Sequence, residues 1–358
     1  MKLDRLEKVI RNMRDMKLTQ LLISAPASIY YLTGKWISPG ERMLALRVSD
    51  SGECQLFANK LFALSPMDGI ELIEYSDTEQ PIDFLSEKTE SGLMGVDKDW
   101  PCRFALPLSE KRSDVRLVIG SPAVDRARML KTKEEIDLMR ESSLMNDKAI
   151  GRAISAVQAG VTEHDIASAY NSAAKEFGAE GESFDSLICF GPNCAEPHHA
   201  TDATLLKEGD SVILDVGAKM NGYCSDMTRT VFFGKATDEQ KKVYDLVERA
   251  NRAGREAVKP GVPLKDVDRA ARRVIEEAGY GKYFIHRTGH GIGLEVHEFP
   301  DVSESSEAVC EPGMIFSVEP GIYLPGKFGV RVEDLVCVTE DGCETFNQFS
   351  KEMREIEC

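Results

Sequence analysis

Residues 1–18 place apolar side chains at helical spacing between charged ones, which predicts an amphipathic helix and not the unbroken apolar core of a signal peptide. Short apolar runs separated by turn residues follow, and they predict the strands of a mixed α/β domain. The predicted strands are Gln20–Ser24, Tyr30–Gly34, Arg42–Val48, Cys54–Ala58, Ile70–Glu74, Gly92–Val96 and Val115–Ile119. This part of the chain contains no His and no Gly-rich phosphate loop, so we expect the chemistry to lie further on.

Beyond residue 131 the pattern changes to long amphipathic helices followed by strands. Thr132 and Glu135 form a capping box, which starts a helix, and this helix is predicted to run to Gly160. A second predicted helix starts at Thr162. Two predicted strands come next, at Ser211–Val216 and Tyr223–Phe233. The unit is therefore interpreted as helix, helix and β-hairpin.

This unit of two helices and a hairpin is then repeated. A second capping box starts a helix at Thr237, which is predicted to run to Val258. The aligned segments are residues 158–166 with 259–267, and residues 209–217 with 313–321. The period of roughly 100 residues is longer than that of a solenoid repeat. We therefore predict one domain built from two similar halves, with a site where the halves meet.

The predicted fold class is α/β (α+β), with two domains. The length of 358 residues suits two domains of ordinary size. We place a small mixed α/β N-terminal domain at 1–122 and a linker at 123–131. The larger domain, with two pseudo-symmetric helix-helix-hairpin halves, is placed at 132–358.

The charge of the chain argues against several classes of partner. Lys and Arg number 44 and Asp and Glu number 60, which gives a formal net charge of −16. The phosphate backbone of nucleic acids and the surface of anionic membranes repel an acidic protein. No apolar run reaches the roughly 18 residues of a membrane-spanning helix. The nine Cys include no CxxC pair, so we expect free thiols in a reducing compartment, the cytoplasm.

The aligned halves carry acidic residues at matching positions. Asp215 aligns with Glu319, and Asp226 follows in the first hairpin as Glu333 follows in the second. We therefore expect each hairpin to carry one carboxylate per strand. Charges within apolar strands are costly to bury unless they are paired or bind a metal. Four converging carboxylates would repel one another, and a pair of divalent cations such as Mn²⁺, Co²⁺ or Zn²⁺ would remove that repulsion.

Histidines are concentrated near these acids. Five of the six lie in two short stretches, residues 197–199 and 286–297. His290 stands among three glycines, Gly289, Gly291 and Gly293. We expect these glycines to adopt positive φ and to let a ligand approach closely. One imidazole added to four carboxylates predicts an asymmetric site for two metals, which at about 3.5–4 Å from each other can hold a bridging hydroxide and polarise a carbonyl.

Other reactive side chains have simpler interpretations. His164 follows a helix N-cap, where we expect it to be exposed. Glu295 and Glu298 are interpreted as solvated groups or as groups that support the ligands. A thiol nucleophile needs a base and has no recognisable motif here, so we assign a packing role to Cys189, Cys194 and Cys224.

Five residues resemble, in type and spacing, the metal ligands of the pita-bread metallopeptidases: Asp215, Asp226, His290, Glu319 and Glu333. That family includes methionine aminopeptidase, aminopeptidase P and prolidase. Residues 28–34, Ser-Ile-Tyr-Tyr-Leu-Thr-Gly, resemble the creatinase-like N-terminal domain of prolidase and aminopeptidase P. Methionine aminopeptidases usually lack that domain, so the resemblance, which covers nearly the whole chain, favours the proline-directed branch.

The resemblance implies two divalent metal ions, with Mn²⁺ expected first and Co²⁺ or Zn²⁺ as alternatives. By resemblance, Asp215 would bind one ion, and His290 and Glu319 would bind the other. Asp226 and Glu333 would bridge both ions. Glu319 is also the implied proton shuttle for the attacking water, because a ligand carboxylate can hold and pass a proton.

The resemblance also implies residues that contact the substrate. His198 and His297 match two family histidines that are expected to hydrogen-bond the substrate or the tetrahedral intermediate, so they count with Glu319 as catalytic. His286 and Arg331 match positions that line the family's pocket. We expect Arg331 to point to the same strand face as Glu333, two residues later.

By this resemblance the chain would hydrolyse peptides with proline in the second position, most directly as an Xaa-Pro dipeptidase and as a homodimer. Some prolidases have an Arg after the second His stretch, where this chain has Asp301, so aminopeptidase P activity on longer peptides remains the alternative. A metal-independent hydrolase of the creatinase type and a non-enzymatic binding module are further alternatives. Both are disfavoured because all five ligand positions are filled.

Overall fold

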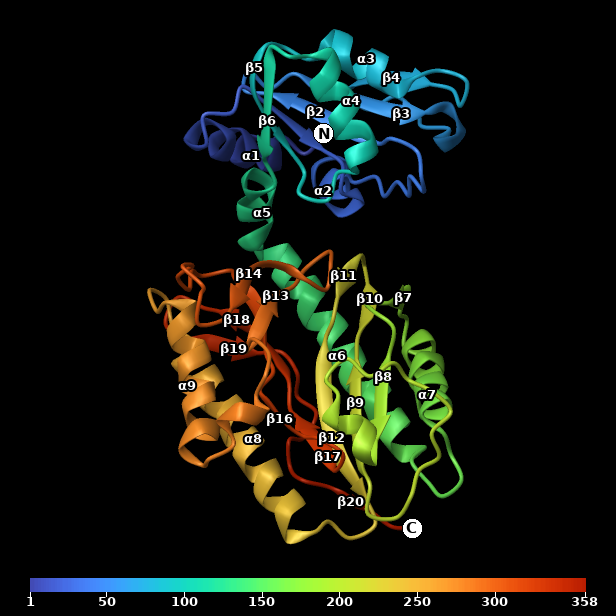
Figure 1. The fold of residues 1–358 in the computed structure, drawn as a ribbon, viewed down its shortest axis with the longest axis vertical. Helices are drawn as coiled ribbons and strands as arrows, with labels where there is room; N and C mark the ends of the chain where they lie inside the picture. The colour runs from blue at the N-terminus through green and yellow to red at the C-terminus, as the bar shows by residue number, and fades with distance from the viewer. The chain divides into compact units, whose positions relative to one another are not determined.

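The computed structural model describes residues 1–358, which divide into two compact units at residues 1–128 and 129–358 (Figure 1). The segment predicted as a linker, residues 123–131, is largely helical, because helix α5 spans Pro122–Met129. None of the helices combines the length and the apolarity that crossing a bilayer requires.

The first unit is built around one mixed sheet. Its strands are β1 (Gln20–Ile23), β2 (Ala45–Ser49), β3 (Cys54–Asn59), β4 (Glu71–Tyr75), β5 (Gly92–Val96) and β6 (Val115–Ile119). Its helices are α1 (Leu3–Asp15), α2 (Pro26–Thr33), α3 (Pro81–Lys88) and α4 (Cys102–Lys111), with the 3₁₀ helix η1 (Lys60–Phe62). The strand order is β4-β3-β2-β1-β5-β6, and α3 and α4 pack together beside the sheet. The mixed α/β domain expected here is therefore present.

One predicted strand of this unit is wrong. The segment Tyr30–Gly34 is not a strand but the end of helix α2. Pro26 opens the helix, where its missing N–H has no intrahelical partner to lose, and Gly34 ends it with a left-handed φ of 72°. A short apolar run suits a buried helix as well as a strand, so periodicity could not separate the two.

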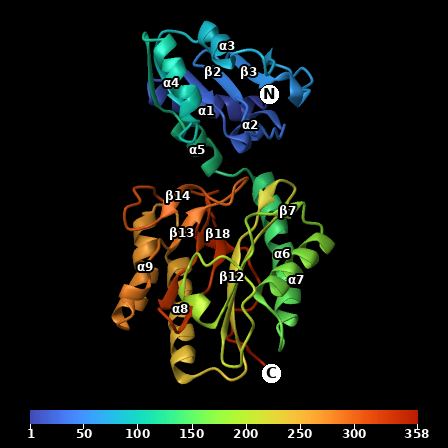
Figure 2. The ribbon, with the colours of Figure 1, turned by 45° about the vertical axis from the view of Figure 1, so that its right-hand side comes forward.

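The second unit begins each of its halves with a pair of helices. They are α6 (Lys133–Ser155), α7 (Glu163–Glu176), α8 (Asp238–Ala257) and α9 (Leu264–Glu277). Capping boxes are formed at Thr132, Thr162 and Thr237. Helix α6 is shorter than predicted and ends at Ser155. In both views, α6 and α7 lie on one side of the strands of this unit and α8 and α9 on the other (Figures 1 and 2).

Many short strands lie between these helix pairs. They are β7 (Gly181–Glu182), β8 (Leu187–Phe190), β9 (Ser211–Val216), β10 (Ala218–Met220), β11 (Tyr223–Cys224), β12 (Met227–Phe233), β13 (Gly289–Gly291), β14 (Glu298–Val302), β15 (Ile315–Val318), β16 (Gly321–Leu324), β17 (Phe328–Arg331), β18 (Asp334–Val338), β19 (Cys343–Thr345) and β20 (Glu355–Ile356). Two 3₁₀ helices, η2 (Gly191–Ala195) and η3 (Gly281–Tyr283), complete the unit. The two larger sheets have the strand orders β20-β12-β9-β8 and β14-β13-β15-β18-β19.

The predicted duplication is visible in these sheets. In the first half β9 pairs antiparallel with β12, and the hairpin continues as β10 with β11. In the second half β15 pairs antiparallel with β18, and the hairpin continues as β16 with β17. Each half is thus two helices and one long hairpin that is broken near its middle, which is the pita-bread arrangement.

Strands β12 and β17 join the two halves. The backbone N–H of Glu333 donates to the carbonyl of Thr228 at 3.1 Å. The Thr230 hydroxyl donates to the carbonyl of Arg331 at 2.8 Å and accepts from the Arg331 N–H at 3.2 Å. The middle of each broken hairpin is therefore brought against the other half, and the acidic residues lie at these breaks.

Candidate metal centre

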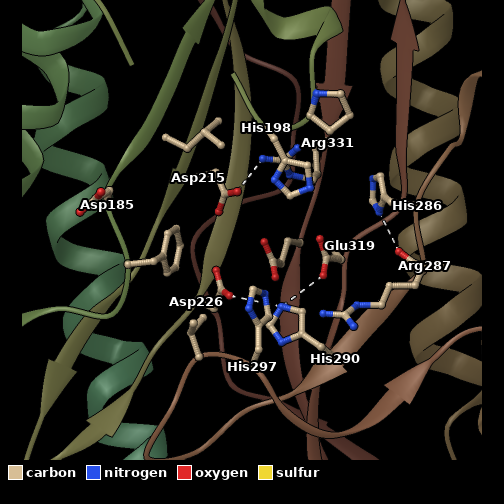
Figure 3. A pocket seen from close by; sticks show the side chains of 15 residues that line it. Asp185, His198, Asp215, Asp226, His286, Arg287, His290, His297, Glu319 and Arg331 are labelled. Carbon is tan, nitrogen blue, oxygen red and sulfur yellow. Dashed lines mark hydrogen bonds and ion pairs between the residues drawn. The ribbon is translucent and has the colours of Figure 1, made fainter. Parts of the chain in front are cut away.

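A pocket of about 450 Å³ in the second unit is lined by every residue that the sequence singled out for the site (Figure 3). These residues are His198, Asp215, Asp226, His286, His290, His297, Glu319, Arg331 and Glu333. The rest of the lining consists of the apolar residues Phe184, Leu187, Pro197 and Val296 and of the charged residues Asp185 and Arg287. The volume is within the usual range for small-molecule sites.

The acidic residues reach the pocket in a different way from the one expected. Only Asp215 lies within a strand, β9. Asp226 falls between β11 and β12, Glu319 directly follows β15, and Glu333 falls between β17 and β18. The prediction of one carboxylate per strand is therefore wrong for three of the four residues. Breaks in pairing leave the backbone free to turn these side chains inward, which period-2 reasoning does not foresee.

Three of the four carboxylates have a buried oxygen that lacks any hydrogen-bond partner: Oδ1 of Asp215, Oδ1 of Asp226 and Oε1 of Glu333. Asp226 and Glu333 are only 3% and 2% exposed. Buried polar atoms in proteins are nearly always paired, because leaving one without a partner costs about 1–3 kcal/mol. Hard oxygen ligands without protein partners are the donors that divalent cations such as Mn²⁺ prefer. The residues present therefore fit the two divalent ions that the sequence predicted.

His290 lies among these carboxylates. Its Nε2 is 3.7 Å from Oδ2 of Asp226 and 3.3 Å from Oε1 of Glu319. Its Nδ1 is 3.1 Å from the carbonyl of Gly291, and a proton on Nδ1 would leave the lone pair of Nε2 facing the acids. One ligand atom each from Asp226, His290 and Glu333 lies within 4.8 Å of the others. This grouping can hold a metal ion.

Three carboxyl groups of the pocket, those of Asp226, Glu319 and Glu333, hold protons more tightly than exposed carboxyls do. Burial, followed by the charges of Glu333 and Asp215, raises the pKa of Asp226 well above its usual value. Burial, followed by Glu319 and Asp215, raises the pKa of Glu333 in the same way. Burial also raises the pKa of Glu319 to about 7, although Arg331 opposes this rise. Without metal, the protein thus favours protons where cations would otherwise neutralise the charge.

Arg331 lines the pocket and holds the side chain of Asp215. Its side chain is buried, its Nη2 donates to Oδ2 of Asp215 at 2.5 Å, and its Nη1 donates to the Tyr323 hydroxyl at 2.9 Å. His286 joins this group, since its Nε2 is 2.8 Å from the Tyr323 hydroxyl and its Nδ1 is 2.7 Å from the carbonyl of Arg287. The polar atoms of both residues are therefore engaged by the protein itself.

A second buried cation holds the strand that follows Glu333. Arg229 is 1% exposed, and its Nη1 donates to the carbonyl of Glu333 at 2.6 Å. Its Nη2 donates to Oδ1 of Asp334, which is fully buried, at 2.8 Å. Removing Asp334 would leave the buried charge of Arg229 without an acidic partner, at a cost of about 3–5 kcal/mol, whereas Asp334 also pairs with Lys351 and Arg255. Arg229 thereby fixes the backbone from which Glu333 projects.

The glycines around His290 are required for a different reason from the predicted one. Gly289, Gly291 and Gly293 do not adopt positive φ. A Cβ on Gly289 would lie 1.8 Å from the carbonyl oxygen of Ser317, and one on Gly291 would lie 2.6 Å from that of Phe299. Glycine is needed because neighbouring protein strands, rather than a ligand, approach the backbone closely.

The remaining histidines differ in their surroundings. His198 lies in the loop after η2, and His297 lies just before β14, with its ring 4.2 Å from that of His290. Burial, followed by Arg287, lowers the pKa of His297, and burial, followed by His297, lowers that of His290 to about 3. Burial, followed by Arg331, lowers the pKa of His286 to about 3. These three imidazoles are therefore neutral at neutral pH.

Sequence reasoning missed Arg287, which also lines the pocket. Its Nη1 is 2.5 Å from Oδ1 of Asp301, and its side chain is 36% exposed. The residue stands inside the His-rich stretch that drew attention, but only the fold shows that its side chain reaches the pocket. Glu298 was interpreted as a solvated or supporting group, and it forms a buried ion pair with Lys131 at 3.3 Å. His164 is exposed, as predicted.

Comparison with known proteins identifies the second unit and most of the first. The model of metallopeptidase family M24 matches residues 137–340, and that of the creatinase/prolidase N-terminal domain matches residues 5–130. A protein of Staphylococcus aureus strain MSSA476, known only as an uncharacterized peptidase, is 35% identical over 97% of this chain and 99% of its own.

Solved structures give the same result. The structure of a recombinant prolidase from Thermococcus sibiricus has a TM-score of 0.95 at 34% identity and covers 99% of both chains. An X-Pro aminopeptidase from Thermotoga maritima has a TM-score of 0.80 at 30% identity, covering 97% of this chain and 100% of its own. The family model spans more than half of the chain and includes all five proposed metal ligands. This chain, with its creatinase-like first unit and its pita-bread second unit, is therefore a member of metallopeptidase family M24.

Proposed function

We propose that this peptidase is an Xaa-Pro dipeptidase that uses two divalent metal ions. All five ligand positions are filled, which argues against a metal-independent route. The observation that carries the proposal is the set of three buried carboxylate oxygens without protein partners, on Asp215, Asp226 and Glu333, the last two of which group with the imidazole of His290. The similarity to prolidase and X-Pro aminopeptidase structures supports proline-containing substrates. The metal-independent creatinase type would not explain these unpaired oxygens.

Asp215, Asp226, His290, Glu319 and Glu333 would hold the two ions, with Mn²⁺ as the first expectation and Co²⁺ or Zn²⁺ as alternatives. When bound, such a pair of cations supplies a water nucleophile at neutral pH and polarises the carbonyl that it attacks. The protein's own part is to move protons and to orient the peptide. By resemblance to the family, Glu319 would accept the proton of the attacking water and pass it to the leaving proline nitrogen.

His198 and His297 would stabilise the charge that develops on the scissile carbonyl and on the leaving group. Both line the pocket, and His297 is neutral at neutral pH because burial lowers its pKa. A neutral imidazole can donate one N–H to a developing oxyanion without repelling the cationic amino terminus of the substrate. Arg331 and His286 are assigned to substrate binding by resemblance, and their internal hydrogen bonds make them rigid walls of that subsite.

The apolar residues that line the pocket can contact the proline ring. Phe184, Leu187 and Val296 offer carbon surface, and Pro197 lies beside His198 at the same rim. The nitrogen of an Xaa-Pro bond carries no hydrogen, so the site needs no acceptor for it in the intact substrate. In the proposed complex, the proline ring would contact these apolar side chains and the acidic residues would face the scissile bond.

The proposal predicts metal-dependent cleavage of Xaa-Pro dipeptides. Protein treated with chelator should be inactive, and added Mn²⁺ or Co²⁺ should restore hydrolysis of Ala-Pro and Leu-Pro but not of Ala-Ala. Mn²⁺ at a hundredfold excess over its Kd should also raise the free energy of unfolding by about 2.7 kcal/mol. Activity that survives chelation would favour the creatinase type, and cleavage of Gly-Pro-Gly without cleavage of any dipeptide would favour aminopeptidase P.

We expect Arg287 to bind the free carboxylate of a dipeptide and thereby to set the preference for dipeptides over longer peptides. Its guanidinium is the pocket cation with an exposed face, whereas that of Arg331 is buried and engaged. A hydrogen bond between charged groups contributes about 1.5–3 kcal/mol, so Arg287→Gln should raise KM for Ala-Pro about tenfold or more. The KM for Ala-Pro amide, which has no free carboxylate, should change little.

Asp301→Asn provides the opposite change in the same experiment. It removes the acid that competes for Arg287, so it should lower KM for Ala-Pro. Arg273→Gln is the control, because Arg273 is exposed and pairs with Glu277 on a helix surface. Equal effects of Arg287→Gln on Ala-Pro and on its amide would contradict the assignment.

A homodimer in the cytoplasm remains the expectation for the working enzyme.

A further inference from the structure

The loop that carries His198 into the pocket is held by a carboxylate outside the pocket. This loop, residues 191–202, follows β8 and has no regular structure beyond η2. His198 and Pro197 line the pocket, whereas the next residue, His199, faces Glu163 at the start of helix α7. The two consecutive histidines thus point to different places, His198 to the pocket and His199 to Glu163.

Glu163 is the first residue of α7, its side chain is 0% exposed, and it accepts four hydrogen bonds. Its Oε1 accepts from the backbone N–H of Phe190 at 2.8 Å and from Nδ2 of Asn193 at 2.9 Å. Its Oε2 accepts from the backbone N–H of Asp202 at 3.0 Å and lies 3.0 Å from Nε2 of His199. One buried carboxylate therefore holds both ends of the loop and a point beside His198.

Glu163, His199 and Asp202 could also be considered as metal ligands, since one ligand atom of each lies within 4.8 Å of the others. The hydrogen bonds argue against that role. Each oxygen of Glu163 already accepts two donors, so neither has a lone pair to give to a cation. The four donors satisfy both buried oxygens without any ion.

We propose that Glu163 and His199 are positioning residues that fix His198 against the reacting carbonyl. A hydrogen-bond donor stabilises a transition state only if it is held within a fraction of an ångström of the productive position. Cys194 and Thr201 also anchor the loop, but the bond from His199 to Glu163 holds it at the residue next to His198, which is itself exposed and outside regular structure. This inference rests on the proposed function for its catalytic part, and on the loop contacts alone for its structural part.

The test combines hydrogen exchange with kinetics in Glu163→Gln and His199→Ala. In Glu163→Gln one acceptor oxygen becomes an NH₂ donor that opposes the N–H groups of Phe190 or Asp202, so exchange at the affected amide should rise at least tenfold. The kcat/KM for Ala-Pro should fall at least tenfold, mainly through kcat. In a His198→Ala background the same change should cost less than twofold, because the held residue is already gone.

Two further variants separate positioning from general damage. His199→Gln keeps an N–H donor that can reach Glu163, so it should restore most of the rate lost in His199→Ala. His164→Ala, which alters the adjacent exposed histidine on the same helix, is the control and should keep wild-type exchange and rate. If Glu163→Gln unfolds the protein, His199→Ala carries the test.

Unchanged exchange in the loop, or an equal loss of kcat/KM in the presence and absence of His198, would overturn the positioning role. Failure of the proposed function has a different signature. Wild-type protein would then cleave no Xaa-Pro peptide with any metal, while exchange at Phe190 and Asp202 would still decide whether Glu163 holds the loop.

Discussion

Asp226→Asn is expected to lose hydrolysis of Ala-Pro about a thousandfold or more and yet to be more stable than the wild type when both are free of metal. The variant keeps the shape of the side chain but removes a charge that the metals need. The metals together contribute several kcal/mol to the transition state, and each 1.36 kcal/mol is tenfold in rate. The gain in stability has a separate cause, which is the burial of a charged side chain beside other carboxylates.

The variant should gain stability because the folded and unfolded wild type differ in the protonation of Asp226. Burial and the neighbouring Glu333 raise the pKa of Asp226 in the folded protein, whereas the unfolded chain ionises near 3.8. Between these two values the folded state holds a proton that the unfolded state has lost, so the wild type loses stability as pH rises above about 4. The advantage of Asp226→Asn should be absent below pH 4, grow as pH rises, and level off above the folded pKa.

Thermal unfolding in chelator between pH 4 and pH 8 measures this difference. Asp245→Asn is a suitable control, because Asp245 is an exposed helix residue paired only with Arg249. Added Mn²⁺ should reverse the order, because it stabilises the wild type and has little effect on Asp226→Asn. A variant that is less stable than the wild type at pH 8 without metal would show that Asp226 is not under charge repulsion.

Gly289→Ala is expected to destabilise the second unit by about 3 kcal/mol and to abolish activity. Overpacking in a tight interior costs about 1–3 kcal/mol, and here the obstacle is a backbone carbonyl that cannot rotate away. The new Cβ would lie 1.8 Å from the carbonyl oxygen of Ser317, which directly follows Phe316 in β15. Strand β13 must then move away from β15, and this carries His290 away from Glu319.

Urea unfolding of the metal-free protein measures the loss, and hydrolysis of Ala-Pro measures the displacement of His290. Gly342→Ala is the matched control, since a Cβ there meets nothing within 4 Å and the residue does not adopt positive φ. The control should stay within about 0.5 kcal/mol of the wild type, as surface substitutions usually do. If Gly289→Ala keeps full activity, the spacing of the two strands does not set the geometry of the site.

The duplicated fold could be predicted from the sequence because each half carries local signals for its helices and strands. The capping boxes at Thr132 and Thr237 were predicted because each forms within four residues, and recognising the repeat required no knowledge of long-range contacts. The structure adds a third box at Thr162, where only a helix start was predicted. The four acids could be picked out because the repeat aligns them within apolar segments, and His290 because glycines flank it, whereas His198 was found only through the family resemblance. All of them line one pocket.

The remaining features depend on long-range contacts that residue patterns do not encode. The Arg287 side chain reaches the pocket only through the packing of its stretch against the rest of the unit, and Glu163 holds a loop nearly 40 residues away. The glycines around His290 were recognised, but the reason for them lies in Ser317 and Phe299, which come from other strands. Breaks in the hairpins were missed because a strand pattern does not show where pairing stops.

The hydrogen bonds between β12 and β17 have a consequence for biosynthesis. Thr228 and Glu333, whose side chains are joined at 2.7 Å, lie 105 residues apart, and Glu333 stands close to the C-terminal end of this sequence. Contacts of such large separation form late, because loop closure must come first. With Glu333 as a proposed ligand, a nascent chain on the ribosome therefore has no complete metal centre before this residue has been translated.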